Sequence, residues 1–90
     1  MAKGKKFDND KPRFDLLDPQ FLEDTAEVLT EGAEQYGDYN WKQIERERYI
    51  AASYRHLNAL HKGEVNDPKS GKPHAAHLAC NAMFLHWLDT

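Results

Sequence analysis

Helix start and stop residues divide this sequence into three helical segments. Asp18 followed by Pro19 is typical of a helix start, because an aspartate side chain caps the first turn and proline suits the first helical position. Gly37 and Gly63 are typical of helix ends, and Pro73 introduces a last apolar segment. The sequence therefore predicts helices over residues 18–37, about 46–62, and from 73 to near the C-terminus.

Apolar residues recur at helical spacing in each segment, at about 100° per residue. The predicted core positions are Leu22, Ala26, Leu29, Ala33 and Tyr36 in the first helix, Ile50, Tyr54, Leu57 and Leu60 in the second, and Leu78, Phe84, Leu85 and Leu88 in the third. The sequence has no convincing strand pattern. The predicted fold is all-α, with three main helices over residues 18–90 and an extended N-terminal arm over residues 1–17, where the proline after Lys11 disfavours helix.

The length and charge of the chain limit the kinds of protein that it can be. Ninety residues form one domain that buries about 60–65% of the surface of its unfolded chain, so we expect a homo-oligomer, a dimer or a tetramer. A net charge of −3 predicts neither a nucleic-acid partner nor an anionic membrane. The lone cysteine, Cys80, excludes an internal disulfide, and no apolar run is long enough for a membrane span or a secretion signal. We expect the protein to act in the cytoplasm.

Four acids on the first helix form what we call the acidic stripe. Asp24, Glu27, Glu31 and Glu34 are spaced by three, four and three residues, so they share one helix face opposite the apolar arc. A water-facing stripe is the simpler interpretation, because solvent and salt screen the repulsion between carboxylates. A divalent cation such as Mg²⁺, which prefers oxygen ligands, is the alternative.

A second acidic pair, Glu64 and Asp67, stands in a polar loop after the second helix. By itself the loop is typical of a turn, with Asp67 capping it ahead of a proline. If folding brings this pair to face Glu31 and Glu34, the four carboxylates can hold one or more cations.

Polar residues also occupy the predicted core face of the third helix. His74, His77 and Asn81 share a helical stripe with leucines, and His56 lies at the edge of the apolar stripe of the second helix. Buried polar groups need hydrogen-bond partners, so these residues either satisfy each other or line a pocket. Core or capping histidines are a simpler interpretation than a zinc site, because Cys80 falls mid-helix and is most simply a small buried residue.

Several strings together resemble a known family. KFDNDKPRFDLLDP, EGAEQYGDYNW, RHLNALHKGEVNDPKSGKPH and HAAHLACNAMFL match, in order and spacing, a family of short proteins frequent in bacteriophages and named for a dATP/dGTP diphosphohydrolase N-terminal domain. The family is similar to the MazG-like all-α nucleoside triphosphate pyrophosphohydrolases. The resemblance covers residues from about 6 to 88.

The resemblance implies MazG-like helical packing, Mg²⁺ dependence, a purine nucleotide partner, a helical nucleotide-binding domain over residues 18–90, and the host cytoplasm as location. It implies catalytic and metal-binding roles for Glu31, Glu34, Glu64 and Asp67, with Glu27 and Asp24 offering an alternative register. It implies nucleotide-binding roles for Lys11, Arg13, Asn40, Trp41, His56, His74, His77 and Asn81, with Lys11 and Arg13 on phosphates and Asn40 and Trp41 on the base or sugar.

The leading functional hypothesis is therefore a metal-dependent pyrophosphohydrolase that converts purine (deoxy)nucleoside triphosphates to monophosphates and pyrophosphate. The alternative from another class is a non-catalytic phage protein that binds and sequesters a host signalling nucleotide. A third hypothesis is a structural or regulatory helical protein whose acids are only solvated.

Overall fold

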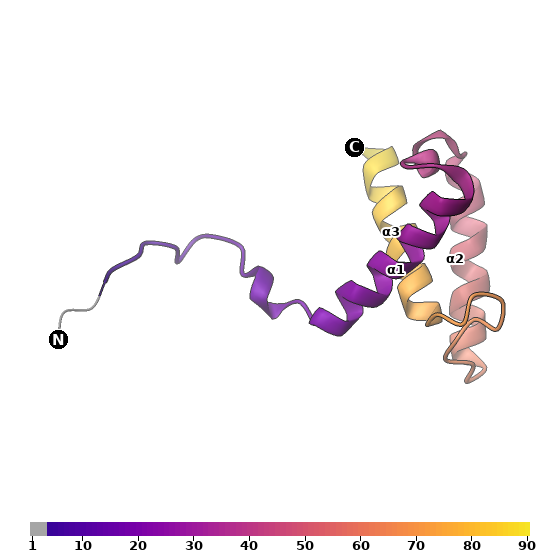
Figure 1. The fold of residues 1–90 in the computed structure, drawn as a ribbon, viewed down its shortest axis with the longest axis horizontal. Coiled ribbons are helices and arrows are strands. Elements are labelled where there is room, and N and C mark those ends of the chain that lie inside the picture. The colour runs from indigo at the N-terminus through magenta and orange to yellow at the C-terminus, as the bar shows by residue number, and fades with distance from the viewer. Residues whose placement is uncertain (1–3) are drawn as a thin grey trace.

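The computed structural model describes residues 4–90 and confirms the all-α prediction. Its elements are η1 (Phe14–Leu16), α1 (Pro19–Tyr36), η2 (Asn40–Gln43), α2 (Arg46–His61) and α3 (His74–Asp89), where η marks a short 3₁₀ helix (Figure 1). Within this described part the chain has no strand, and its one β-bridge pairs Asn66 with Pro73. No helix in the described range is both long and apolar enough to cross a membrane.

The helix boundaries fall where the local residues predict them. The Asp18 carboxylate accepts a hydrogen bond from the Phe21 amide at 2.9 Å, which caps the first turn of α1. Gly37 ends α1 with φ 94°, and Gly63 adopts the same φ just after α2. Both values lie in the left-handed region that glycine tolerates best, so these two residues stop the helices at little cost.

Helix α3 is the centre of the molecule. Both α1 and α2 pack on α3, as does η2, whereas α1 and α2 make at most a marginal contact with each other. The four buried residues of the described chain, His74, Ala76, Cys80 and Asn81, all belong to α3. The two outer helices are therefore held apart over a shared floor, and this arrangement creates the cleft described below.

Two apolar residues of the predicted α2 core stripe are on the outside. Tyr54 and Leu57 are 71% and 55% exposed, whereas Ser53 and His56 are half-buried. Helix α2 turns the face that carries Ser53 and His56 toward α3. On this face the Tyr49 ring packs on Phe84, with ring centroids 4.8 Å apart, and His56 meets the histidines of α3. The prediction for these two positions is wrong, since periodicity alone cannot identify which face meets a partner.

Residues 4–17 of the N-terminal arm project from the helices instead of packing on them, and residues 1–3 of the predicted arm lie outside the described residues (Figure 1). Phe7, Phe14 and Leu16 are each at least 74% exposed. The radius of gyration is 16.9 Å, against about 12 Å for a compact chain of this length. No large side chain in the described range is fully buried, so a single copy of the chain has only a small core.

Candidate functional site

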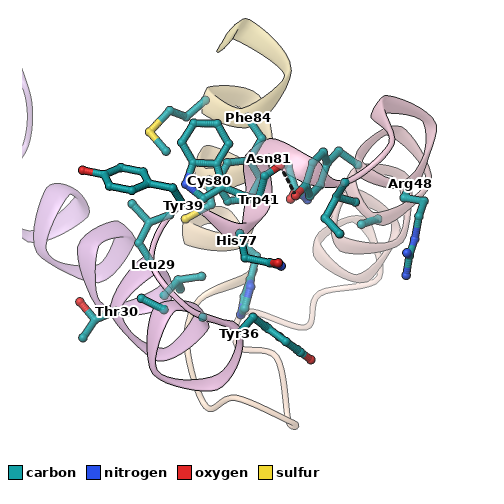
Figure 2. A pocket seen from close by; sticks show the side chains of 18 of the residues that line it. Leu29, Thr30, Tyr36, Tyr39, Trp41, Arg48, His77, Cys80, Asn81 and Phe84 are labelled. Atoms are coloured by element: carbon teal, nitrogen blue, oxygen red, sulfur yellow. Dashed lines mark hydrogen bonds between the residues drawn. The ribbon is translucent and has the colours of Figure 1, made fainter. Parts of the chain in front are cut away.

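A cleft of about 970 Å³ lies between α1 and α2, with α3 as its floor. Figure 2 shows Leu29 of α1 and Arg48 of α2 on opposite sides, with His77, Cys80 and Asn81 of α3 between them. Ligand pockets for small molecules are typically about 300–1,000 Å³, so the cleft can hold a ligand of nucleotide size.

One end of the cleft is aromatic. Trp41 stacks on Phe84 with ring centroids 4.9 Å apart, and Trp87 meets the indole edge-on at 5.5 Å. The Trp41 carbonyl accepts a hydrogen bond from the Tyr49 hydroxyl at 3.0 Å, which ties η2 to α2. Trp41 is therefore fixed in place, and it can offer a π surface to a ligand ring without further ordering.

The cleft also holds an amide with no protein partner. Asn81 is only 8% exposed, and its side chain makes no hydrogen bond to any other residue in 4–90. No fully buried side-chain nitrogen or oxygen in this range lacks a partner, so the Asn81 amide is reached by solvent from the cleft and is available to a ligand. Arg48 and Arg55 line the α2 side and bring two positive charges that can pair with anionic groups.

At the base of the cleft lies a network that we call the histidine corner, formed by His56, Glu64, Asp67, Ser70, His74 and His77. His74 is its centre: its Nε2 lies 2.7 Å from the Glu64 carboxylate, and its Nδ1 lies 2.8 Å from Nδ1 of His56. The His77 Nε2 lies 2.8 Å from the Ser70 hydroxyl and 3.8 Å from Asp67 Oδ2. The rings of His56 and His77 stack in parallel, 4.7 Å apart. These contacts explain how polar residues occupy the packed face of α3.

The loop between α2 and α3 holds this corner by backbone hydrogen bonds. The Asp67 amide donates to the Lys72 carbonyl at 2.8 Å, and the Gly71 amide donates to the Asp67 carbonyl at 2.7 Å. The His74 amide donates to the Val65 carbonyl at 2.9 Å. The loop therefore presents the Asp67 side chain to α3 in a fixed position.

Burial sets the charge of the corner. It lowers the pKa of His56 and of His77, and the neighbouring histidines lower both further, although Asp67 acts in the opposite direction. Burial also acts to raise the pKa of Asp67, but the hydrogen bond from the Lys69 amide and the attraction of the histidines outweigh it and leave this pKa below its ordinary value. Near pH 7 the corner therefore holds an ionised Asp67 beside two neutral imidazoles.

The carboxylates of the acidic stripe have other partners than those of the histidine corner. The Lys72 ammonium lies 2.8 Å from a Glu27 carboxylate oxygen and 3.8 Å from one of Glu31. Asp24 accepts a hydrogen bond from Gln20 at 2.9 Å, and the exposed Glu34 pairs with no other residue in the described range. A lysine of the α2–α3 loop thus supplies the positive charge that we assigned to a metal ion.

The two predicted acidic pairs do not form one cluster of ligand atoms among the described residues. Within residues 4–90, one set of three histidine, cysteine or acidic side chains has its ligand atoms all within 4.8 Å, and it consists of His56, Asp67 and His77. Glu31, Glu34 and Glu64 belong to no such set. Asp67 is therefore the one member of the predicted acidic quartet that joins a ligand cluster.

Comparison with known proteins gives the family. The sequence model of the family described as dATP/dGTP diphosphohydrolase, N-terminal, matches residues 1–90. The chain belongs to this family. A protein of Salmonella phage PMBT28 named dATP/dGTP diphosphohydrolase is 42% identical over 85 residues, which cover 94% of this chain and 29% of that protein. The chain thus spans under a third of the length of this relative. No solved structure matches the chain.

The predicted nucleotide-binding residues of this chain fall into three places. Asn40, Trp41, His77 and Asn81 line the cleft. His56 and His74 lie in the histidine corner beneath it. Lys11 and Arg13 lie on the projecting arm, where Arg13 pairs with Asp15, so one copy of the chain does not bring them to the cleft.

Sequence reasoning missed four polar residues of this domain: Arg48, Arg55, Ser70 and Lys72. Arg55 directly precedes His56, and the pair of basic residues was a usable signal. Nothing local predicts that Lys72 meets Glu27, 45 residues away. Cys80 fits its predicted role as a small buried residue, because burial raises its pKa to about 11 and its thiol donates to the Thr25 carbonyl.

Proposed function

We propose that this domain binds a purine deoxynucleoside triphosphate in the cleft and takes part in its hydrolysis to a monophosphate and pyrophosphate. The observation that carries the proposal is the Asn81 amide, which faces the cleft without a hydrogen-bond partner among the described residues, beside His77, a residue of both the cleft and the histidine corner. A ligand with an aromatic ring, hydrogen-bonding edges and an anionic end fits this combination. The name of the phage relative supports the choice of nucleotide.

In this proposal the base lies at the aromatic end of the cleft. A purine ring gains about 1–3 kcal/mol from stacking on a fixed aromatic side chain such as Trp41. The amides of Asn40 and Asn81 can each donate and accept hydrogen bonds, which suits the edge of a base or the sugar hydroxyl.

The triphosphate then extends toward the histidine corner. Arg48 and Arg55 can neutralise phosphate oxygens from the α2 side. Because burial keeps His56 and His77 neutral near pH 7, each has a lone pair that, when no metal ion holds it, can accept a proton from an attacking water. Attack of that water on the α-phosphorus breaks its bond to the bridging oxygen and releases pyrophosphate.

Mg²⁺ dependence is part of the proposal. Mg²⁺ is usually held by one or two carboxylates together with substrate phosphates, not by an all-protein cage. Asp67, whose Oδ2 faces the corner, and Glu64 are the candidate carboxylates. The ion would neutralise charge on the phosphates, and this role needs no convergence of all four predicted acids.

The test measures pyrophosphate release from dGTP and dATP with Mg²⁺, with dCTP as the pyrimidine comparison. We expect release from the purine nucleotides by the unmodified chain, and a loss of about 100-fold or more in Asp67→Asn. The Glu34→Gln variant distinguishes a site at the histidine corner from a site at the acidic stripe. Only a site at the acidic stripe predicts that Glu34→Gln also loses activity. Absence of release from the unmodified chain with every nucleotide overturns hydrolysis by this domain alone.

A specific observation also favours the non-catalytic alternative. Lys72 pairs with Glu27 and Glu31 of the acidic stripe, and the two acidic pairs form no common ligand cluster in the described residues, whereas the cleft has the features of a binding site. A thermal-shift panel of nucleotides tests this hypothesis. A nucleotide that binds raises the melting temperature of the chain once the nucleotide concentration exceeds its Kd. A raised melting temperature without pyrophosphate release therefore identifies binding alone.

We also propose that the chain works as a homo-oligomer. The exposed large apolar residues include Tyr54 and Leu57 on the outer face of α2, Trp87 on α3, and Phe14 on the arm. Covering such surfaces stabilises a small domain by about 25 cal/mol for each Å² removed from water. Light scattering tests the proposal, and a monomer at working concentration contradicts it.

A further inference from the structure

We propose that His56, Asp67 and His77 form a binding site for one divalent transition-metal ion and that this site prefers such an ion to Mg²⁺. The three side chains come from α2, the α2–α3 loop and α3, and their ligand atoms lie within 4.8 Å of one another. Two imidazole nitrogens and one carboxylate oxygen are a donor set that suits Zn²⁺, Co²⁺ or Fe²⁺, whereas Mg²⁺ prefers oxygen ligands alone.

Asp67 is held with one oxygen free. Its Oδ1 accepts a hydrogen bond from the Lys69 amide at 2.8 Å, and its Oδ2 faces Nε2 of His77 at 3.8 Å. Two ligand atoms on a tetrahedral ion lie about 3.4 Å apart, because each bond is about 2.0–2.2 Å long. A closing movement of about 0.4 Å therefore brings this pair to coordination distance.

The lone pair of His77 is held on Nε2, the nitrogen that lies 3.8 Å from Asp67. The Ser70 hydroxyl oxygen accepts a hydrogen bond from the Lys72 amide at 3.1 Å, and its own hydrogen is free to donate to His77 Nε2. The nitrogen that accepts this bond carries the lone pair that a metal ion needs. An incoming ion replaces the hydroxyl hydrogen as the partner of that nitrogen.

The chain from Glu64 through His74 orients His56. Glu64 accepts a hydrogen bond from His74 Nε2, so a neutral His74 has its lone pair on Nδ1. His56 then donates its Nδ1 hydrogen to that lone pair, which leaves the lone pair of His56 on Nε2. Metal-binding histidines commonly donate their second nitrogen to such a partner, and this contact fixes the tautomer and the ring orientation. Glu64 and His74 are thus positioning residues.

One ring must turn when an ion binds. His56 and His77 are parallel within 4° and stacked, and two stacked rings cannot both direct an in-plane lone pair at one ion. Loss of the stacking on metal addition is therefore a specific sign of binding at this site. Its readout is a shift of the imidazole carbon-bound proton resonances of these two histidines.

The test is a titration of the full chain with Co²⁺, Zn²⁺ or Mg²⁺ chloride alone, followed by calorimetry and by the visible absorption of Co²⁺. We expect one Co²⁺ or Zn²⁺ per chain and at least tenfold weaker binding of Mg²⁺. We also expect the resonances of His56 and His77 to move while those of His61 do not. Because no nucleotide is present, the result does not depend on whether the domain hydrolyses or only binds a nucleotide.

Matched variants locate the ion. Asp67→Asn and His56→Gln should weaken Co²⁺ binding by about 100-fold or more, and Glu64→Gln by about 10–100-fold, because it removes only the orienting contact. His61→Gln on α2 and His86→Gln on α3 remove exposed histidines from the same helices and should leave binding unchanged. Circular dichroism checks that each variant keeps its helices.

Three outcomes overturn the proposal. One is absence of Co²⁺ and Zn²⁺ binding by the unmodified chain at millimolar concentration. Another is Mg²⁺ binding as tight as that of Co²⁺. The third is unchanged Co²⁺ binding in a folded Asp67→Asn variant.

Discussion

The histidine corner and the acidic stripe are two clusters of ionisable side chains that the fold treats in opposite ways. In the corner, His74 is 4% exposed, and the side chains of Asp67 and His77 are each 20% exposed. In the stripe, the side chains of Glu27 and Glu31 are 45% and 50% exposed. The corner groups contact one another, whereas the stripe acids are largely exposed and their partners in the described residues are Lys72 and Gln20.

The difference shows which cluster is the better candidate for chemistry. Removing ionisable groups from water costs free energy unless they are partnered, so a fold that encloses several of them has a reason to do so. A solvated stripe of acids needs no such reason, because screening keeps its repulsion small. We therefore place the chemistry of this domain at the corner and the adjoining cleft.

The largest expected effect separates the two regions by stability. His74→Ala removes a buried ring and leaves Glu64 and His56 without their partner, so we expect a loss of about 2–4 kcal/mol in the free energy of unfolding. Glu34→Ala, on the exposed stripe, should change it by less than about 0.5 kcal/mol. Urea unfolding measures both. Equal effects of the two substitutions would contradict the contrast between the regions.

The pH dependence of stability gives a second, smaller effect. Burial lowers the pKa of His56 and of His77 in the folded chain. The charges of His74 and Arg55 lower the pKa of His56 further, whereas Asp67 acts to raise the pKa of both histidines. The unfolded chain then binds protons more readily, so this stability is present above about pH 6.5 and is lost as the pH falls through the lowered folded values.

We therefore expect the melting temperature to fall by a few degrees between pH 7 and pH 5. His77→Gln should flatten this dependence, because glutamine does not titrate. Glu34→Gln should keep the slope of the unmodified chain in the same buffers. A melting temperature that rises on acidification to pH 5 would show that the histidines are not held neutral.

The smallest expected effect is a change in melting temperature when the ion pairs of Lys72 with Glu27 and Glu31 are removed. Lys72→Met removes the cation beside Glu27 and Glu31, and we expect the melting temperature to fall by about 1–3 °C, as for other partly exposed ion pairs. In a double-mutant cycle with Glu27→Gln the two effects should not add, because the residues share one contact. Additive effects would mean that Lys72 and Glu27 are not paired in solution.

Local chemistry predicted the helices well and the site only in part. Asp18, Gly37 and Gly63 set boundaries through contacts within one turn of the chain, so a sequence is enough to find them. The pairing of Lys72 with Glu27 depends on how α1 and the α2–α3 loop lie on α3, which no local pattern encodes.

The histidines illustrate the same limit. The sequence predicts His74, His77 and Asn81 on the packed face of α3, as found, but the hydrogen-bond partners of His74, namely His56 and Glu64, come from other elements. Helix α2 places His56 inward and leaves Tyr54 and Leu57 outside, against the apolar pattern. The choice follows from packing with α3 and not from the residues of α2 alone.

One measurement tests the central claim most directly, namely that the cleft above the histidine corner binds the nucleotide. Calorimetric titration with a non-hydrolysable dGTP analogue and Mg²⁺ compares the unmodified chain with Asn81→Ala and Glu34→Gln. The account predicts that Asn81→Ala raises Kd by about tenfold or more, since it removes a buried hydrogen-bonding group, and that Glu34→Gln changes Kd by less than about twofold. Unchanged binding in a folded Asn81→Ala variant, together with lost binding in Glu34→Gln, would contradict the account and return the site to the acidic stripe.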